Sequence, residues 1–213
     1  MWRKVSEAFG KIAREYDSWY EKNALFVSEL KALKALGEVP SPSLEIGVGT
    51  GVFAKALGFT HGLDPSLSML LLACQKHIFG VCGLGEEMPF KNKSFKACGL
   101  FFTLCFLSDP GKVLEECRRV LKPKGLFWLG FIPKESPWGL YYQEKAKRGH
   151  PLYSLARFRE GEEVLNLLKA WGFAIIKGKS TLFQPPAGPF YEEEPRDGLF
   201  SEAGFWAILA VKD

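Results

Sequence analysis

An acidic residue followed by three glycines at alternate positions is the part of the chain best suited to chemistry. Glu45 stands two positions before Gly47, and Gly49 and Gly51 follow. The apolar run into Gly47 predicts a buried strand, and residues 50–57 predict the start of a helix. Glycines at such a turn allow a tight bend and a close approach of the backbone to a ligand. Amides at a helix start favour a negative or electron-rich group, so the turn is a candidate cradle for a small molecule.

The spacing of the glycines indicates which kind of ligand the turn can bind. A dinucleotide-binding turn has the pattern G-x-G-x-x-G, and Val52 stands where its third glycine would be. A Walker loop needs Lys-Ser or Lys-Thr after its glycines, and neither follows here. The segment resembles motif I, E-x-G-x-G-x-G, of the class I S-adenosylmethionine-dependent methyltransferases. By itself the motif also fits a turn that only packs a strand against a helix. The resemblance implies cofactor contacts by five residues: Glu45, Gly47, Val48, Gly49 and Gly51.

A second acid stands where the next strand is predicted to end. In an open α/β sheet, ligands lie beyond the carboxyl ends of the strands, where an acid can hold the two hydroxyls of a ribose. Residues 64–69 match the family pattern D-x-S-x-x-M. The resemblance implies that Asp64 binds the ribose and that Pro65 and Met69 lie against the adenine. The residues alone leave open a helix N-terminal role for Asp64 and a core position for Met69.

Two further segments continue the resemblance. Residues 81–90 are similar to the family's G-x-A-E-x-L-P-F, with Gly85 and Glu86 at the Ala and Glu positions and Leu84 in place of a common acid. This implies that Gly85 and Glu86 lie at the adenine edge, although Glu86 also fits a solvated loop carboxylate. From Ala97 a nearly continuous apolar run predicts a fully buried strand. In the family the carboxyl end of this strand faces the transfer site, which implies roles for Phe102 with the cofactor and Thr103 with the substrate.

The later part of the core also follows the family's order. Asp109-Pro110 predict the start of a helix. The run from Arg119 to Gly125 matches R-V-L-K-P-G-G, with Lys124 in place of the first glycine, and leads into a strand predicted at 126–132. Lys96 stands where the family usually has Asp.

Matches in this order across residues 44–132 identify the chain as similar to the class I methyltransferases, a group that includes ubiquinone and menaquinone biosynthesis enzymes. The resemblance implies an α/β, Rossmann-like fold with S-adenosyl-L-methionine as cofactor. Its sheet is mostly parallel and seven-stranded, in the order 3-2-1-4-5-7-6, with an antiparallel last strand and helices on both faces. We expect one domain over 1–213: a helical lid (1–40), the cofactor-binding core (42–132), a substrate cap (133–160), and a C-terminal helix and last strands (161–213).

Aromatic residues gather in the expected lid and cap. Residues 9–20 have helical spacing and resemble the N-terminal helices that cover the cofactor in this family, which makes Tyr16 and Trp19 lid and substrate candidates. A second helix is predicted at 23–36. Residues 133–158 are aromatic and basic, and Tyr142 and His150 are the substrate candidates there. Plain helix packing, or a solvated loop position for His150, is the open alternative for each residue taken alone.

Composition narrows the class of protein. With 213 residues, 47% of them hydrophobic and 24% charged, the chain suits one globular domain. The five cysteines form no C-x-x-C and mostly lie in apolar runs, which indicates reduced core residues, and the three histidines lack metal-ligand spacing. We therefore expect no metal. The net charge of +4 comes with only short basic clusters, so we expect no nucleic-acid partner.

No apolar stretch reaches the roughly 18 residues that span a bilayer. The N-terminus has no apolar signal core, which predicts a cytoplasmic location. No feature of the sequence specifies an oligomeric state.

The predicted activity is methyl transfer to a small molecule, either an aromatic compound or an amine. The cofactor carries the difficult chemistry, and no residue stands out as a required base or nucleophile. Two other functions stay open at this point. A nicotinamide-dependent oxidoreductase would need G-x-G-x-x-G and a catalytic Tyr/Lys or His, and a non-enzymatic sensor would bind the cofactor without transferring its methyl group.

Overall fold

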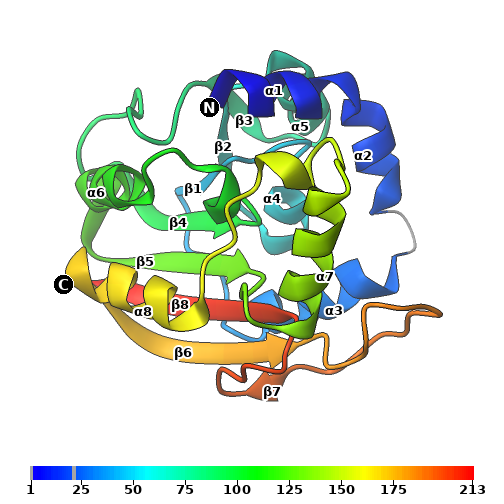
Figure 1. Ribbon diagram of the computed structural model, residues 1–213. Helices are drawn as coiled ribbons and strands as arrows, with labels where there is room; N and C mark the ends of the chain where they lie inside the picture. Colours follow the sequence, from blue (N-terminus) through cyan, green and yellow to red (C-terminus); the bar gives the residue numbers. More distant parts are fainter. Residues whose placement is uncertain (1, 21–22) are drawn as a thin grey trace.

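One mixed sheet forms the centre of the molecule (Figure 1). The computed structural model describes residues 2–20 and 23–213, and within them eight strands join this sheet in the order β3-β2-β1-β4-β5-β8-β6-β7. Pairing is parallel from β3 to β5, and β8 runs antiparallel to both β5 and β6. The strands are β1 (Ser43–Ile46), β2 (His61–Asp64), β3 (Phe79–Cys82), β4 (Phe95–Phe101), β5 (Leu121–Phe131), β6 (Phe173–Thr181), β7 (Arg196–Asp197) and β8 (Phe205–Lys212).

The predicted strand order and the antiparallel last strand are confirmed, but the predicted number of seven strands is wrong by one. The additional strand, β7, has only two residues. It pairs with the edge of β6, where Lys179 forms an ion pair with Asp197 at 2.5 Å and the Ser180 hydroxyl donates to the Gly198 carbonyl. Long-range contacts of this kind leave no periodic signal in the sequence.

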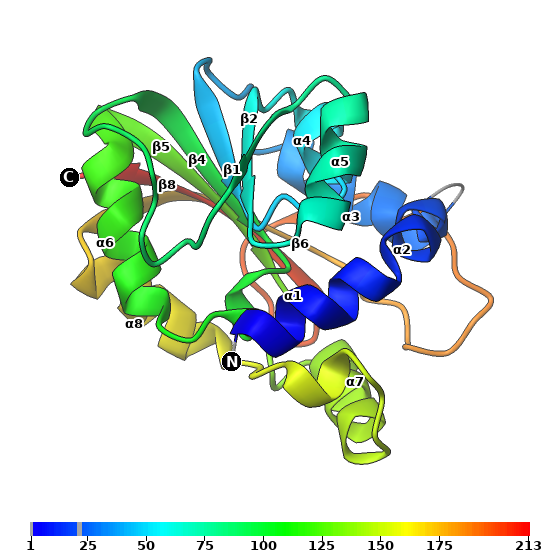
Figure 2. The same cartoon turned by 90° about the horizontal axis from the view of Figure 1, so that it is seen from above.

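Helices cover both faces of the sheet, as predicted (Figure 2). α3 (Ala24–Lys34), α4 (Val52–Leu57) and α5 (Leu67–Gln75) pack on one face. α6 (Pro110–Val120) and α8 (Gly161–Ala170) pack on the other. The remaining helices, α1 (Trp2–Lys11), α2 (Ala13–Trp19) and α7 (Pro137–Lys147), lie outside these two layers (Figure 2), and there are two 3-10 turns, η1 (Leu104–Phe106) and η2 (Tyr153–Leu155), in the described residues.

Local sequence signals set several helix starts. The Asp109 carboxylate accepts from the Lys112 amide at 3.0 Å, and Pro110 occupies the first turn, so the predicted start of α6 is confirmed. Ser136 caps α7 in the same way by accepting from the Gly139 amide. Lys124, which replaces a family glycine, adopts a left-handed backbone with φ 58°. Glycine takes this conformation without steric cost, which explains the family's preference there.

Two local predictions are wrong. The helix expected over 9–20 is broken at Ile12 into α1 and α2, and the change of direction brings the Phe9 and Tyr16 rings within 5.5 Å of each other. Cys74 and Cys82 are exposed rather than in the core, because Cys82 ends the edge strand β3 and Cys74 lies on the outer side of α5. In the described residues, no helix has the length and apolar character needed to cross a membrane.

Candidate functional site

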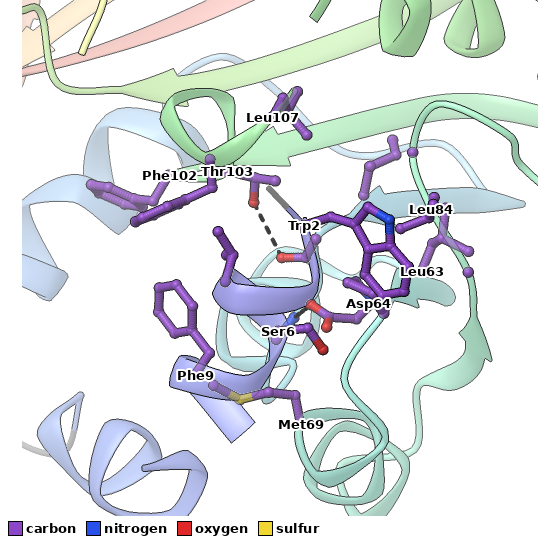
Figure 3. Close-up of a pocket in the computed structure, with 18 of the residues that line it drawn as sticks. Trp2, Ser6, Phe9, Leu63, Asp64, Met69, Leu84, Phe102, Thr103 and Leu107 are labelled. Atoms are coloured by element: carbon purple, nitrogen blue, oxygen red, sulfur yellow. Dashed lines mark hydrogen bonds between the residues drawn. The ribbon is translucent and has the colours of Figure 1, made fainter. Parts of the chain in front are cut away.

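A cavity of about 130 Å³ opens at the carboxyl ends of β1, β2 and β4 (Figure 3). This is the edge at which open α/β sheets bind their ligands. The wall is built from the glycine turn after β1, the turn into α5, the loop after β3, the end of β4, and the N-terminal helices. Its residues are Trp2, Val5, Ser6, Phe9, Tyr16, Ile46, Gly47, Gly49, Leu63, Asp64, Pro65, Met69, Gly83, Leu84, Gly85, Glu86, Phe101, Phe102, Thr103, Phe106 and Leu107.

The three glycines of the turn share a left-handed backbone, but an added side chain would meet different surroundings at each position. Gly47, Gly49 and Gly51 have φ of 68°, 52° and 77°, a region that other residues rarely adopt. A Cβ on Gly47 would fall 2.3 Å from the Thr103 hydroxyl oxygen, and one on Gly51 would fall 3.0 Å from the Ala73 Cα. A Cβ on Gly49 would meet no atom of residues 2–20 or 23–213 within 4 Å. Gly49 therefore borders open space, and that space is the cavity.

Asp64 is held at the cavity wall by two backbone amides. The Gly49 amide donates to Oδ2 at 2.9 Å and the Ser66 amide donates to Oδ1 at 2.8 Å. The residue is 9% exposed, and burial raises the pKa of its carboxyl although the two amides oppose the rise. A carboxylate has about four acceptor positions, so two remain for donors in the cavity.

Glu45 lies behind the turn and does not line the cavity. Its side chain is 2% exposed, and its Oε2 has no hydrogen-bond partner among the residues that the structure describes. Burial, and then the nearby charge of Asp64, raise the pKa of Glu45 well above its ordinary value. A positive group bound in front of the turn would favour the ionised carboxylate. Val48 and Gly51, also predicted to contact the cofactor, lie behind the cavity wall with it.

The loop after β3 forms the third side of the cavity. Gly85 packs so closely on the core that an added Cβ would fall 3.0 Å from Ile46 Cγ2. The Glu86 carboxylate accepts from the Ser108 amide at 3.3 Å. Arg119 anchors the rest of the loop, because its guanidinium donates to the Phe90 and Met88 carbonyls at 2.7 and 2.9 Å.

The end of β4 carries a strained residue. Phe102 has φ 56°, which is unusual for a bulky side chain and is typical of functional positions. Its amide donates to the Gly130 carbonyl at 2.9 Å, and its ring stacks on Phe205 with centroids 5.1 Å apart. The Thr103 hydroxyl oxygen lies 3.0 Å from the Phe101 carbonyl oxygen and 3.3 Å from that of Gly47, within donating distance of either. These contacts join the end of β4 to the glycine turn.

Comparison with known proteins decides the family. Residues 44–129 match a methyltransferase domain family. An uncharacterized protein of Mycobacterium tuberculosis is 42% identical over 212 residues, covering 97% of this chain and 74% of that protein. A solved structure from Thermotoga maritima, named as an S-adenosylmethionine-dependent methyltransferase and possible histamine N-methyltransferase, has a TM-score of 0.90 and 33% identity, covering 98% of this chain and 100% of that one. The chain belongs to the class I S-adenosylmethionine-dependent methyltransferases. Demethylmenaquinone methyltransferase of Thermotoga maritima is 35% identical over 130 residues, or 55% of this chain and 56% of that protein.

This methyltransferase therefore uses S-adenosylmethionine, and most of the predicted cofactor residues surround one cavity. Gly47, Gly49, Asp64, Pro65, Met69, Gly85, Glu86 and Phe102 all line it. Of the substrate candidates, Tyr16 and Thr103 line the same cavity, whereas Trp19, Tyr142 and His150 do not.

The three substrate candidates outside the cavity have different surroundings. Trp19 is 48% exposed on the outer side of α2. The residue spacing predicts that Trp19 lies in a helix, but it does not predict which way the side chain points. The His150 Nδ1 accepts from the Leu152 amide at 3.3 Å, and partial burial, with the nearby charge of Lys145, lowers the pKa of its imidazole. Tyr142 packs in a neighbouring aromatic cluster, with its ring centroid 4.5 Å from that of Tyr153.

The first turns of α1 lie outside the segments that the sequence predicts to form the site. α1 lies across the ends of β1, β2 and β4 (Figure 2) and places four side chains on the cavity: Trp2, Val5, Ser6 and Phe9. Figure 3 shows the Trp2 ring near Asp64 and Leu84. The 2-5-6-9 spacing is typical of one face of a helix, so the periodicity of the sequence does indicate that these residues lie together. The predicted helix begins only at residue 9 and therefore leaves most of them out.

Proposed function

We propose that this methyltransferase binds S-adenosylmethionine in the cavity beside Gly49 and Asp64 and methylates a small molecule, an amine or an aromatic compound. The observation that carries the proposal is the Asp64 carboxylate, which two amides orient while its remaining acceptor positions face the cavity. A vicinal diol fits such a carboxylate.

The other walls fit the rest of the cofactor. The open space at Gly49 admits the methionine half close to the backbone, and the unpaired Glu45 oxygen behind the turn favours a positive group in front of it. Gly85 and Glu86 suit the adenine edge, with Met69 and Pro65 on its face. When bound, the cofactor supplies an electrophilic methyl group on a sulfonium. This fit leaves Thr103, next to the cofactor candidate Phe102, to face the acceptor.

The chain's own residues then act by orientation and exclusion of water. Holding an acceptor at reacting distance supplies roughly 7–11 kcal/mol of the barrier reduction in favourable cases. α1 and α2 cover the cavity with Trp2, Phe9 and Tyr16, and they are the lid in this proposal. Residues 133–160, which contain α7, are the proposed substrate cap.

The class of acceptor has two sources of support. The Thermotoga maritima structure is that of a possible histamine N-methyltransferase, which favours an amine. The partial match to demethylmenaquinone methyltransferase favours an aromatic acceptor. Both are small molecules, and the aromatic lid and cap suit either.

Calorimetric titration with S-adenosylmethionine and S-adenosylhomocysteine tests the cofactor site. Asp64→Asn removes a charged acceptor, and losing such a bond costs about 1.5–3 kcal/mol, or roughly 10–150-fold in affinity. Asp197→Asn is the matched control, since that side chain is 85% exposed and remote from the cavity. Equal affinities for both variants, with folding verified by thermal unfolding, would refute the assignment.

Methyl transfer to a cell extract tests the class of acceptor. With radiolabelled S-adenosylmethionine, we expect label in the fraction that passes an ultrafiltration membrane. Label only in the retained nucleic acid or protein would contradict a small-molecule acceptor while leaving the cofactor site intact.

A further inference from the structure

A second, smaller cavity of about 30 Å³ lies at the carboxyl ends of β4 and β5. Phe102, directly after β4, lines both this cavity and the one assigned to the cofactor, so the two share a wall. The other apolar side chains of the second cavity are Leu104, Phe131, Ile132 and Phe158. A methyl acceptor must lie against the cofactor, so a cavity across a shared wall can take the part of the acceptor that extends away from it.

Two arginines from the segment before α8, Arg157 and Arg159, also line the second cavity. Backbone hydrogen bonds fix this segment at both ends: the Arg157 amide donates to the Cys105 carbonyl at 2.7 Å, and the Lys134 amide donates to the Arg159 carbonyl at 2.9 Å. Figure 1 shows the segment, in yellow, passing the arrowheads of β4 and β5 on its way to α8. The fold therefore holds two guanidinium groups at one small cavity.

The Arg159 guanidinium is only partly engaged. Its Nη1 pairs with the carboxylate of Glu163, one turn into α8. Its Nε is buried and has no hydrogen-bond partner among the residues that the structure describes. A buried donor without an acceptor costs free energy, and because Arg159 lines the cavity, an anionic ligand there can supply the acceptor.

The rest of the lining brings no negative charge to the cavity. Among the described residues, none of the lining side chains is acidic, and Glu160, which stands next to Arg159, pairs with the Lys134 ammonium at 3.1 Å. The Cys105 thiol does line the cavity. Burial raises its pKa to about 12, although the charge of Arg159 opposes the rise, so it stays neutral near pH 8. The cavity thus has a positive character.

We propose that the second cavity is a recognition subsite for the acceptor, and that the acceptor is an aromatic acid whose carboxylate binds Arg157 and Arg159. A guanidinium presents paired donors that match the two oxygens of a carboxylate. The inference rests on the proposed cofactor site and narrows the proposed acceptor from an amine or an aromatic compound to an aromatic acid.

The size and the lining of the subsite fit such a group. One water-sized group needs about 10–15 Å³ of cavity, so roughly two fit in this one, as the two oxygens of a carboxylate require. The rings of Phe102, Phe131 and Phe158 suit the aromatic body beside it. An acceptor anchored at the arginines extends past Phe102 toward Thr103 and the cofactor cavity. Two positive side chains at one cavity also oppose an ammonium group there.

Calorimetry on the S-adenosylhomocysteine complex tests the subsite without turnover. The probes are 3-phenylpropanoate, its neutral match 3-phenylpropanamide, and phenethylamine as the cation. We expect the wild type to bind the acid at least about tenfold more tightly than the amide, and Arg159→Gln to weaken binding of the acid about 10–150-fold with little effect on the amide. Arg148→Gln is the matched control, since it also loses an ion pair with a glutamate four residues away but lines neither cavity.

A second variant keeps the test independent of the Arg159–Glu163 ion pair. Arg157→Gln changes an exposed residue, so the fold should be unaffected, as thermal unfolding can verify, while the preference for the acid should fall. No preference for the acid in the wild type, tighter binding of phenethylamine, or an unchanged preference in both arginine variants would overturn the inference.

The same titrations without S-adenosylhomocysteine separate the two proposals. If S-adenosylhomocysteine does not bind, the proposed cofactor site is wrong. The preference for the acid, and its loss in Arg157→Gln and Arg159→Gln, is then still measured in the free protein and decides the subsite by itself.

Discussion

Gly49→Ala separates the backbone strain of the glycine turn from the exclusion of a ligand. Gly49 has φ 52°, and a residue with a Cβ costs about 1–2 kcal/mol in this region. The new methyl group would meet no atom of the described part of the chain within 4 Å, so we attribute the cost to the folded protein to backbone strain. Gly58 offers a matched control, since it has φ 83°, the same open surroundings, and a position outside the cavity. Both variants should therefore unfold about 2–8 °C below the wild type.

Of the two variants, only Gly49→Ala should also weaken binding of the cofactor. Forcing an extra methyl group into a packed contact typically costs about 1–3 kcal/mol, which corresponds to roughly 5–150-fold weaker binding. Calorimetric titration with S-adenosylhomocysteine measures this, and thermal unfolding without ligand measures the strain. Equal affinity of the two variants would show that the space beside Gly49 is not where the cofactor lies.

Two further predictions follow from the loop after β3 and from the cysteines. Arg119→Gln removes the donors to the Met88 and Phe90 carbonyls, so we expect a loss of about 1–2 kcal/mol in the free energy of unfolding and several-fold weaker cofactor binding. Arg118→Gln, which loses bonds to the Trp171 and Gly172 carbonyls instead, should destabilise the protein in denaturant titrations without changing affinity. Burial raises the pKa of the Cys105 thiol to about 12, so it stays protonated at pH values near 8. Mass spectrometry after iodoacetamide treatment should find the exposed Cys74 and Cys82 alkylated well before Cys105, and equal rates would contradict this.

Much of the cavity wall could be predicted from the sequence because its signals are local. A left-handed backbone at a strand-to-helix turn demands glycine, and an acid at the end of the next strand stands at the same sheet edge. Asp64, Gly85 and Phe102 were therefore placed by their positions relative to predicted strands. Spacing could not tell which residues face the cavity and which stand behind it, so Glu45 and Val48 were grouped with Gly49.

The lid was only partly predictable, since periodicity defines a helical face but not what that face covers. It grouped Phe9 and Tyr16 on one side, as the structure shows, yet missed the break at Ile12 that turns α2 relative to α1. Trp19 points to solvent because α2 packs through Tyr16 and Tyr20 instead.

By itself the sequence determined the order of the motifs, the glycine turn, the acid at the end of β2 and the helix caps, because each depends on a few adjacent residues. The tertiary structure alone decided that Glu45 is buried behind the glycine turn and that the first turns of α1 cover the cavity in front of it. A glutamate in a strand next to a turn does not by itself indicate burial. Its desolvation, and hence its chemistry, arises only when elements far apart in the chain pack around it.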